Sequence, residues 1–496
     1  MSVQEVTAIG PLVILTLTGC LALMLEVAGV PVGARKTTPR GHIAILTVLG
    51  LLAAGAWMLV QFSGTGAPHS VFHGALRVDR FGLFFGAVIC VGAALAVMVA
   101  VAWLRARDIE RGEYYAIIAF ASAGMVALAQ AADFLFLFVA LETMSVGVYV
   151  LTGLDRDNSR SPEAALKYFL NGAFAAAILL FGMALLYGAS GVTSIQAIGP
   201  MLRGGAVANQ PLVVAGFAMV VLGLGFKIAA VPLHMWTPDV YDGAPAPATA
   251  FMAAGVKAAA FAALIRVVIA GLGPGAGAGS ESWITLGWIV AVATMSVGNL
   301  AALAQKRIKR LLAYSSIAHA GYALAGVVAA VAGHQEALGA VGFYLMAYAL
   351  MTVGSFGVVA FLEREDGKGA TFDEWSGAAR RYPLIGLAMT VFMFSLAGIP
   401  PTAGFLAKFN LFYNVVDAKL YWLAFIGILN SLVSVYYYLR VLVFMYMKEP
   451  HPKLDGRGGA FLAVGLALAA LLILLTGMLP SAMLQMASQV LDVVKG

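Results

Sequence analysis

Long apolar segments recur along the whole chain and are separated by short polar loops. A helix needs about 20 consecutive apolar residues to cross a hydrocarbon core about 30 Å thick, so runs of this length predict transmembrane helices. Fourteen such runs lie at approximately 9–30, 42–62, 80–104, 114–131, 133–153, 162–188, 212–241, 245–271, 283–304, 309–331, 336–362, 384–415, 418–447 and 459–480. The pattern predicts an all-α polytopic membrane protein with about fourteen transmembrane helices.

Two of these runs are longer than one membrane crossing requires and carry proline near the middle. Pro232 lies in the seventh run, in AAVPLH, and Pro400 and Pro401 lie in the twelfth, in LAGIPPTAGF. Proline removes a backbone donor and clashes with the preceding turn of a helix. We therefore expect helices 7 and 12 to be broken or kinked at these prolines.

The sequences around the two breaks are similar. GFAMVVLGLGFKIAAVP at 216–232 resembles GLAMTVFMFSLAGIPP at 386–401. Helix 12 follows helix 7 by an odd number of crossings, so the second copy would run in the opposite direction. Inverted repeats whose broken helices meet near the bilayer midplane are a known transporter architecture. The similarity is short, and by itself it only suggests such a repeat.

Basic residues are divided unequally between the two sets of alternate loops. With an N-terminus outside, the inner loops hold 19 Lys and Arg residues and the outer loops hold 5. The inner set is Arg35, Lys36, Arg40, Arg105, Arg107, Arg111, Arg156, Arg160, Lys306, Arg307, Lys309, Arg310, Arg364, Lys368, Arg380, Arg381, Lys448, Lys453 and Arg457. The outer set is Arg77, Arg80, Arg203, Lys419 and Lys495. Because inner loops are enriched in Lys and Arg, both termini are predicted on the outer, periplasmic side.

Composition excludes several classes of protein. The chain is 61% hydrophobic and 11% charged, whereas soluble domains carry about 25% charged residues. The sequence pI near 9.2 comes from short loops and not from a basic arm, so no nucleic-acid binding is predicted. Cys20 and Cys90 stand in separate apolar segments without a CxxC or Cys/His cluster, which predicts no metal or redox centre in this chain. The first run is too long for a signal peptide and predicts a retained span.

Four charged residues lie deep inside apolar runs: Glu142, Lys227, Lys257 and Lys408. A charge at bilayer depth costs from a few to more than ~10 kcal/mol, so such residues indicate ion or proton pathways by default. At ~1.5 Å per residue, all four lie near the middle of their helices, as does His319 in YSSIAHAGY. Five titratable groups at one depth predict a relay that runs parallel to the membrane plane.

Simpler explanations exist for single residues in this set. Any one lysine could be a static ion-pair partner, but one carboxylate cannot neutralise three lysines. His319 could be a packing hydrogen-bonder with water held by Ser315 and Ser316, and His234, after the break in helix 7, could be structural or take up protons. Residues near membrane edges are predicted to be structural: Glu26, Asp133 and Arg440, with Glu163 and Lys167 as an i,i+4 pair.

Several long strings resemble subunit N of bacterial respiratory complex I, the NADH:quinone oxidoreductase. They are LFLFVALETMSVGVYVLTGL, EAALKYFLNGAFAAAILLFGMALLYGASG, GLGFKIAAVPLHMWTPDVYDGAPAPATAF, IKRLLAYSSIAHAGYALAG and SLAGIPPTAGFLAKF, collinear from about residue 75 to 445. The resemblance implies an antiporter-like fold with helices 4–8 and 9–13 as inverted five-helix units. The expected divisions are 1–108 (helices 1–3), 109–275 (first unit), 276–448 (second unit) and 449–496 (helix 14).

The resemblance also implies roles for the buried residues. Glu142 in LET, Lys227 in GFK, Lys257 and Lys408 in FLAKF match the charged residues of helices 5, 7, 8 and 12. The related subunit M is expected to have Glu at the position of Lys408, and subunit L is expected to be longer. The implied setting is the membrane arm in a bacterial inner membrane, beside subunits M, K and J. No cofactor is expected in this chain, and FMN, iron–sulfur clusters and quinone are expected in the rest of the complex.

The resulting hypothesis is a proton-translocating subunit driven by electron transfer from NADH to quinone in other subunits. Protons would enter from the cytoplasm near helix 7, past His234, reach Lys227 with Glu142 as its adjustable partner, and pass Lys257 and His319. Lys408 would release them outward. Two alternatives stay open at this point: a subunit of a multisubunit Na+/H+ antiporter, and a membrane scaffold whose buried charges pair statically.

Overall fold

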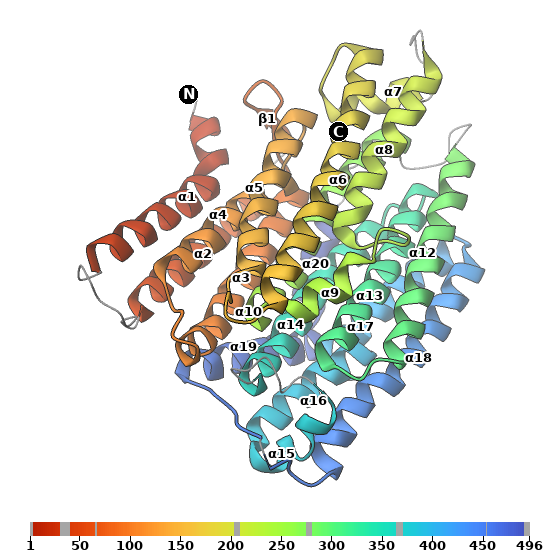
Figure 1. Cartoon of the computed structure of the whole chain (residues 1–496). Coiled ribbons are helices and arrows are strands. Elements are labelled where there is room, and N and C mark those ends of the chain that lie inside the picture. Colours follow the sequence, from red (N-terminus) through yellow and green to blue (C-terminus); the bar gives the residue numbers. More distant parts are fainter. Residues whose placement is uncertain are drawn as a thin grey trace.

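The structure is a bundle of long, roughly parallel helices, given by a computed structural model that describes residues 3–29, 40–64, 67–202, 209–273, 280–363, 371–452 and 454–490. Figure 1 shows the helices crossing the molecule from one end to the other. In this described part, thirteen helices are long and apolar enough to span a membrane. The predicted all-α polytopic membrane fold is confirmed.

The first three long helices form one side of the bundle. They are α1 (Val3–Gly29), α2 (Gly41–Gly64) and α3 (Arg80–Ala106). Between α2 and α3, the strands β1 (His69–Val71) and β2 (Leu76–Val78) pair antiparallel in a small hairpin, which the sequence did not predict. Asp79 caps the first turn of α3 by accepting a hydrogen bond from the Gly82 N–H at 2.7 Å.

The middle of the chain contains the predicted break in helix 7. Its elements are α4 (Gly112–Ala129), α5 (Phe134–Thr152), α6 (Arg160–Ser190), η1 (Ile195–Ala197), α7 (Ile198–Leu202), α8 (Gln210–Ile228), α9 (Trp236–Gly243), α10 (Ala246–Phe251), η2 (Met252–Val256) and α11 (Lys257–Leu272). The α8 helix ends on Ala229 in the left-handed conformation (φ 62°), and Pro232 lies in the irregular segment before α9. Helix 7 is therefore two separate helices.

The second half repeats this interruption in helix 12. Its elements are α12 (Ser280–Leu303), α13 (Ile308–Val331), α14 (Ala337–Leu362), η3 (Asp373–Trp375), α15 (Ala378–Arg381), α16 (Pro383–Ala397), α17 (Ala403–Asp417) and α18 (Tyr421–Met447), followed by α19 (Ala460–Met478) and α20 (Ser481–Ser488). The α16 helix ends on Gly398 (φ 85°), and Pro400 and Pro401 precede α17. Neither α16 nor α17 is long enough to span the membrane alone, so the two together form the fourteenth predicted crossing.

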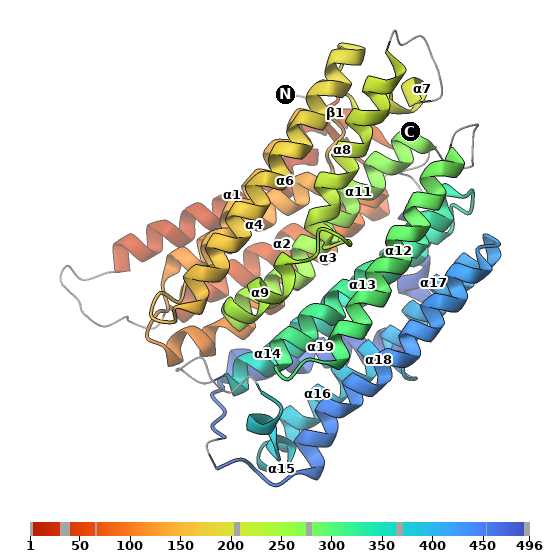
Figure 2. The ribbon, with the colours of Figure 1, turned by 45° about the vertical axis from the view of Figure 1, so that its right-hand side comes forward.

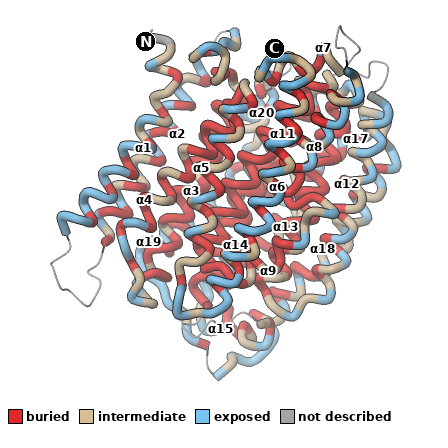
Figure 3. The backbone as a smooth tube through the Cα atoms, turned by 45° about the horizontal axis from the view of Figure 1, so that its top comes forward, coloured by how far each residue is buried: buried red, intermediate tan, exposed pale blue. Residues whose placement is uncertain are grey.

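Burial divides the bundle into a core and a lipid-facing shell. Nearly all residues of α3, α11, α13 and α14 are buried, whereas α1, α6, α12 and α18 expose many large apolar side chains. Figure 3 shows the buried backbone in the centre and exposed stretches along the outer helices. In Figure 2, α12 and α18 run beside α13 along one edge of the molecule. Polar groups on the central helices are therefore shielded from lipid.

Candidate functional site

The predicted site residues come from five different helices near the middle of the bundle. Lys227 is in the last turn of α8, Lys257 begins α11, His319 is near the middle of α13, and Lys408 follows the break on α17. These four side chains are all 6% exposed or less. Glu142 on α5 is half-buried. Because the lysines are buried this deeply, their ammonium groups must be stabilised by other groups of the protein.

Lys227 is held by aromatic side chains and by the end of its own helix. Its Nζ donates a hydrogen bond to the Tyr149 hydroxyl at 3.2 Å and lies 5.0 Å from the ring centroids of both Tyr149 and Tyr168. The π faces of these rings attract a cation. The C-terminal end of a helix also carries partial negative charge, so the end of α8 favours an ammonium group there.

Glu142 does not contact Lys227 directly. In the part of the chain that the structure describes, no ion pair joins the two, and Oε1 of Glu142 is buried without a hydrogen-bond partner. Tyr149 lies seven residues, about two turns, after Glu142 on α5, and it is this residue that reaches Lys227. The Tyr149 hydroxyl, on the same face of α5 as Glu142, therefore makes the direct contact with Lys227.

Lys257 directly follows a wide helical turn. The chain forms a π-helix over η2 before α11, a local distortion that is frequent at functional sites. From this position, the Lys257 Nζ donates hydrogen bonds to both the carbonyl and the hydroxyl oxygen of Ser316 on α13, at 2.5 Å each. It also lies 5.3 Å from the centre of the Tyr348 ring. Lys257 thereby connects the first half of the chain to the second.

His319 occupies the centre of a hydrogen-bonded chain on the second half. Its Nδ1 is 2.6 Å from the Tyr344 hydroxyl, and its Nε2 is 3.0 Å from the Tyr438 hydroxyl. Tyr438 is also hydrogen-bonded to Ser315. Because Ser315 and Ser316 are adjacent, the groups from Lys257 to His319 form a nearly continuous polar path.

Lys408 closes the end of the α16 helix. Its Nζ donates hydrogen bonds to the carbonyl of Ala397 at 3.1 Å and to the Ser431 hydroxyl at 2.9 Å, and it lies 5.4 Å from the Tyr322 ring centre. Ala397 is the last residue of α16, so this lysine, like Lys227, sits at the C-terminal end of a broken half-helix. The two breaks thus create two cation sites of the same kind.

An amide network lies beside Lys408. Asn299 donates from Nδ2 to the Tyr322 hydroxyl at 2.9 Å and accepts at Oδ1 from the Tyr437 hydroxyl at 2.9 Å. Asn299 also donates to Oδ1 of Asn430 at 3.3 Å. These residues join α12, α13 and α18 around the aromatic ring that faces Lys408.

Further polar groups continue along α17 away from Lys408. Asn414 donates to the side-chain oxygen of Asn410 at 3.2 Å, and its own oxygen is 3.0 Å from Nε2 of His334. His334 is also 3.4 Å from Oδ2 of Asp417 at the end of α17. Polar side chains therefore accompany this helix from Lys408 to its end.

Most of these uncharged partners carry no signal in the sequence. Tyrosine and serine are common in apolar helices, so Tyr149, Tyr344, Tyr438 and Ser431 gave no distinct signal. Asparagine did give a signal, because an amide inside an apolar run such as MSVGNLAAL, where Asn299 stands, is costly and so indicates a specific partner. Its partners lie far away in the sequence and could not be read from it.

The remaining predicted residues have simpler surroundings. His234 is half-buried in the segment between α8 and α9, and its Nδ1 has no hydrogen-bond partner. Glu163 and Lys167 form the expected ion pair at 2.8 Å, and Lys167 also pairs with Asp239 at 3.0 Å. Asp133 caps α5 by accepting from the backbone of the next turn.

A separate buried ion cluster lies at the end of the bundle where α14 finishes. Glu363, just after α14, accepts hydrogen bonds from Lys309 Nζ at 2.9 Å and Trp103 Nε1 at 2.7 Å, with Arg107 at 3.8 Å. Burial alone would raise the pKa of Glu363, but the charges of Lys309 and Arg107 lower this pKa below its ordinary value. The cluster ties α3, α13 and α14 together.

Within the described ranges, no group of three or more His, Cys, Asp or Glu side chains is placed to hold a metal ion. The site instead consists of buried ammonium groups, one imidazole and hydroxyl groups in hydrogen-bond contact, which are groups that carry protons. Fold and site together define an antiporter-like, proton-conducting membrane subunit.

Comparison with known proteins gives the family. Residues 131–434, more than half of the chain, match the family described as NADH:quinone oxidoreductase/Mrp antiporter, TM. NADH-quinone oxidoreductase subunit N 1 of Sorangium cellulosum is 43% identical, with 97% of each chain covered. NADH-quinone oxidoreductase subunit N of Trichlorobacter lovleyi is 42% identical, with 99% of this chain and 98% of the relative covered. A chain of respiratory complex I from Thermus thermophilus, solved with bound aureothin, is 35% identical with a TM-score of 0.79, and covers 96% of this chain and 98% of its own.

This chain belongs to the NADH-quinone oxidoreductase subunit N family. The resemblance inferred from its sequence strings is confirmed, as is the prediction of a multi-pass, proton-translocating membrane subunit of the quinone oxidoreductase. The matched family description covers both quinone oxidoreductases and Mrp antiporters, and the nearly full-length relatives decide between these two groups.

Proposed function

We propose that protons cross this subunit along the row Lys227, Lys257, His319 and Lys408. The observation that carries the proposal is the polar path in which Lys257 binds Ser316 and the adjacent Ser315 contacts Tyr438, which in turn contacts His319. A hydroxyl can accept a proton on one side while it donates on the other. The ordered path of the sequence hypothesis thereby gains specific intermediate groups.

Uptake is proposed at the break between α8 and α9. His234 lies in this break with an unpartnered, buried Nδ1, which is an open position for a water molecule or a proton. The next group is Lys227, in the last turn of α8, seven residues before His234 along the chain. Glu142 would act on Lys227 through Tyr149, because the tyrosine hydroxyl contacts the ammonium group while the carboxylate lies further along α5.

Release is proposed along α17. From Lys408 the amides of Asn410 and Asn414 lead to His334, which faces Asp417 at the end of the helix. An imidazole beside a carboxylate can accept a proton from inside and pass it to solvent. Lys408 therefore has a polar route outward in which only neutral amides lie between it and His334.

The orientation and the internal repeats also remain proposals. Figure 3 places the start of α1 and the α20 helix toward the same side of the bundle, which supports an even number of crossings. With the 19 to 5 division of basic residues, this favours periplasmic termini. Seven of those basic residues lie outside the described residues: Arg35, Lys36, Arg203, Arg364, Lys368, Lys453 and Lys495.

The equivalent breaks after α8 and α16 support inverted units at 109–275 and 276–448, with 1–108 and 449–496 outside them.

We further infer neighbours of the kind named in complex I, with subunits M, K and J as the expected ones. A groove of about 540 Å³ opens over α4 and α5, and Glu142 lies in it among Phe138, Val139 and Val146. A half-buried carboxylate with an unpartnered oxygen in an apolar groove is costly unless another chain covers it. Electron transfer through FMN, iron–sulfur clusters and quinone would take place in those other subunits.

The test uses the whole complex, purified and reconstituted in proteoliposomes. We expect Lys227→Ala and Glu142→Ala to abolish most quinone-coupled proton pumping, measured as protons moved per electron. Lys306→Ala is the matched control because this lysine is exposed in the loop after α12. Normal pumping by complexes that carry Lys227→Ala would contradict the proposed path.

A further inference from the structure

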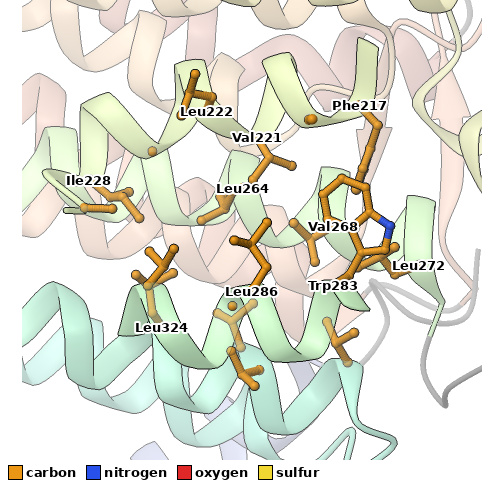
Figure 4. A pocket seen from close by; sticks show the side chains of 18 of the residues that line it. Phe217, Val221, Leu222, Ile228, Leu264, Val268, Leu272, Trp283, Leu286 and Leu324 are labelled. Carbon is orange, nitrogen blue, oxygen red and sulfur yellow. The ribbon is translucent and has the colours of Figure 1, made fainter. Parts of the chain in front are cut away.

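An apolar cavity of about 420 Å³ lies between α8, α11, α12 and α13. Figure 4 shows that Val221, Leu264, Val268 and Leu286 extend into one common space. The cavity is lined by aliphatic and aromatic residues, together with glycine and proline. Water occupies a cavity only where it finds polar partners, so this space is unsuited to water and suited to an apolar occupant.

The cavity is long and narrow. On α8 its wall runs from Phe217 to Ile228, which is ~16 Å along a helix axis. This length is about half of a hydrocarbon core about 30 Å thick, the depth of one leaflet. The volume of about 420 Å³ is spread over this length, so the cavity is elongated along the helices. The space has the dimensions of a single hydrocarbon chain.

The cavity is continuous with the lipid-facing surface. Leu222 on α8 and Leu286 on α12 line it and are 42% and 50% exposed. Beside them on the same two helices, Val214 and Ile289 are exposed apolar residues outside the cavity. In a multi-pass membrane protein, such a surface meets lipid, so a chain can enter from the side without crossing a polar barrier.

One end of the cavity lies near the membrane surface. The rings of Phe217 and Trp283 meet there edge to face, with centroids 4.9 Å apart, within the first two turns of α8 and the first turn of α12. Tryptophan is enriched at the level of lipid headgroups. The other end reaches Pro232 in the break after α8.

We propose that this cavity binds one acyl chain of a phospholipid from the leaflet on the side where α8 begins. The chain would enter between α8 and α12, with its headgroup at the level of Trp283. It would pack against Val231, Pro232 and Leu233, and so support the irregular segment after Lys227. Only this last consequence rests on the proposed proton path; the binding site itself does not.

The test uses the intact complex in nanodiscs of phosphatidylcholine that carries a diazirine at the middle of one acyl chain. After illumination, mass spectrometry locates the adducts. We expect adducts on the deep residues Leu264 and Leu324. The same lipid with the diazirine on its headgroup should not label them. Equal labelling of these residues by both probes, or adducts confined to Leu222 and Leu286, would overturn the proposal.

A filled cavity provides the second measurement. Val221→Phe combined with Val268→Phe places two rings in the space, and we expect labelling of Leu264 to fall at least about tenfold, equivalent to ~1.4 kcal/mol of binding. Ile289→Phe, on the exposed surface of α12 outside the cavity, is the matched control and should label like the unmodified complex. Unchanged labelling in the filled variant, or crosslinks from these positions to a neighbouring subunit, would contradict an acyl chain as the occupant.

Discussion

The ammonium groups of Lys257 and Lys408 are bound by neutral oxygens: those of Ser316 in one case, and those of Ala397 and Ser431 in the other. A buried ion pair would fix the positive charge, because removing one charged partner leaves the other uncompensated. Hydroxyl and carbonyl groups stabilise the ammonium less strongly and tolerate its neutral form. The surroundings of these two lysines therefore suit proton exchange better than static pairing.

Tyr438 offers the sharpest test at the level of a single residue. In Tyr438→Phe the ring remains, but the hydroxyl between Ser315 and His319 is lost. A neutral hydrogen bond contributes ~1 kcal/mol, so we expect the rate of proton pumping to fall about fivefold. Proton uptake and NADH oxidation by reconstituted complexes measure this. Tyr436→Phe is the control, since Tyr436 is 64% exposed on the same helix; equal pumping by both variants would show that the Tyr438 hydroxyl carries no protons.

The sequence made the charged members of the site visible and left their partners hidden. Glu142, Lys227 and Lys408 stand out because charge inside an apolar run is rare. Tyr438 does not stand out in the sequence, because its contact with His319 depends on how α18 packs beside α13. The two residues are 119 positions apart in the chain. The sequence also could not show that Tyr149, two turns after Glu142 on the same face of α5, makes the direct contact with Lys227.

At the level of elements, the prolines predicted the two breaks but not how the breaks are built. Both half-helices end on a residue in the left-handed conformation, Ala229 after α8 and Gly398 after α16. Proline explains why a helix stops, whereas the final backbone geometry depends on packing. Short elements such as the β1–β2 hairpin, α20 and the π turn before Lys257 were not predicted, because each is too brief to produce a periodic pattern.

Gly398 is the residue at which this geometry can be tested. Its φ of 85° strains any other residue, and an added Cβ would meet Cδ of Lys408 at 2.9 Å. We expect Gly398→Ala to destabilise the subunit by ~1–3 kcal/mol and to reduce pumping by displacing Lys408. Thermal unfolding of the complex and its proton-to-electron ratio measure the two effects. Gly188→Ala is the control, since nothing lies within 4 Å of its built Cβ; a Gly398→Ala complex as stable and as active as this control would refute the argument.

At the level of the whole molecule, distant segments are fastened together at one end by the cluster around Glu363. Its carboxylate joins Lys309, at the start of α13, to Trp103 and Arg107 from α3 and its C-terminal end. These residues span more than half of the chain, so the cluster holds the two halves in a fixed relation. From the sequence alone, Arg107 and Lys309 are expected in loops, and nothing in it connects them.

This cluster predicts acid sensitivity. Because the pKa of Glu363 is lowered in the folded protein, its contribution to stability is complete above the ordinary value of 4.5 and is lost as pH falls below it through the folded value. Glu363→Gln should remove that dependence and cost ~3–5 kcal/mol at neutral pH by leaving Lys309 unpaired. Thermal unfolding of the complex from pH 7 to pH 4 measures both effects. Glu449→Gln, at an exposed position after α18, should change neither; an unaltered pH profile in Glu363→Gln would assign the acid sensitivity to other groups.

The common depth of the buried row has an electrical consequence. Lys227 lies in the last turn of α8 and Lys408 contacts the last residue of α16, while Lys257 and His319 lie near the middle of the continuous spans Ala246–Leu272 and Ile308–Val331. Membrane voltage does work of ~2.3 kcal/mol per charge for each 100 mV that the charge crosses, and a step within the membrane plane crosses none of it. On the proposed path, transfer from Lys227 to Lys408 would therefore be electrically silent. The membrane potential would then act on the two proposed steps that run across the membrane, uptake beside His234 and release beside His334, and voltage sensitivity should be sought in those steps.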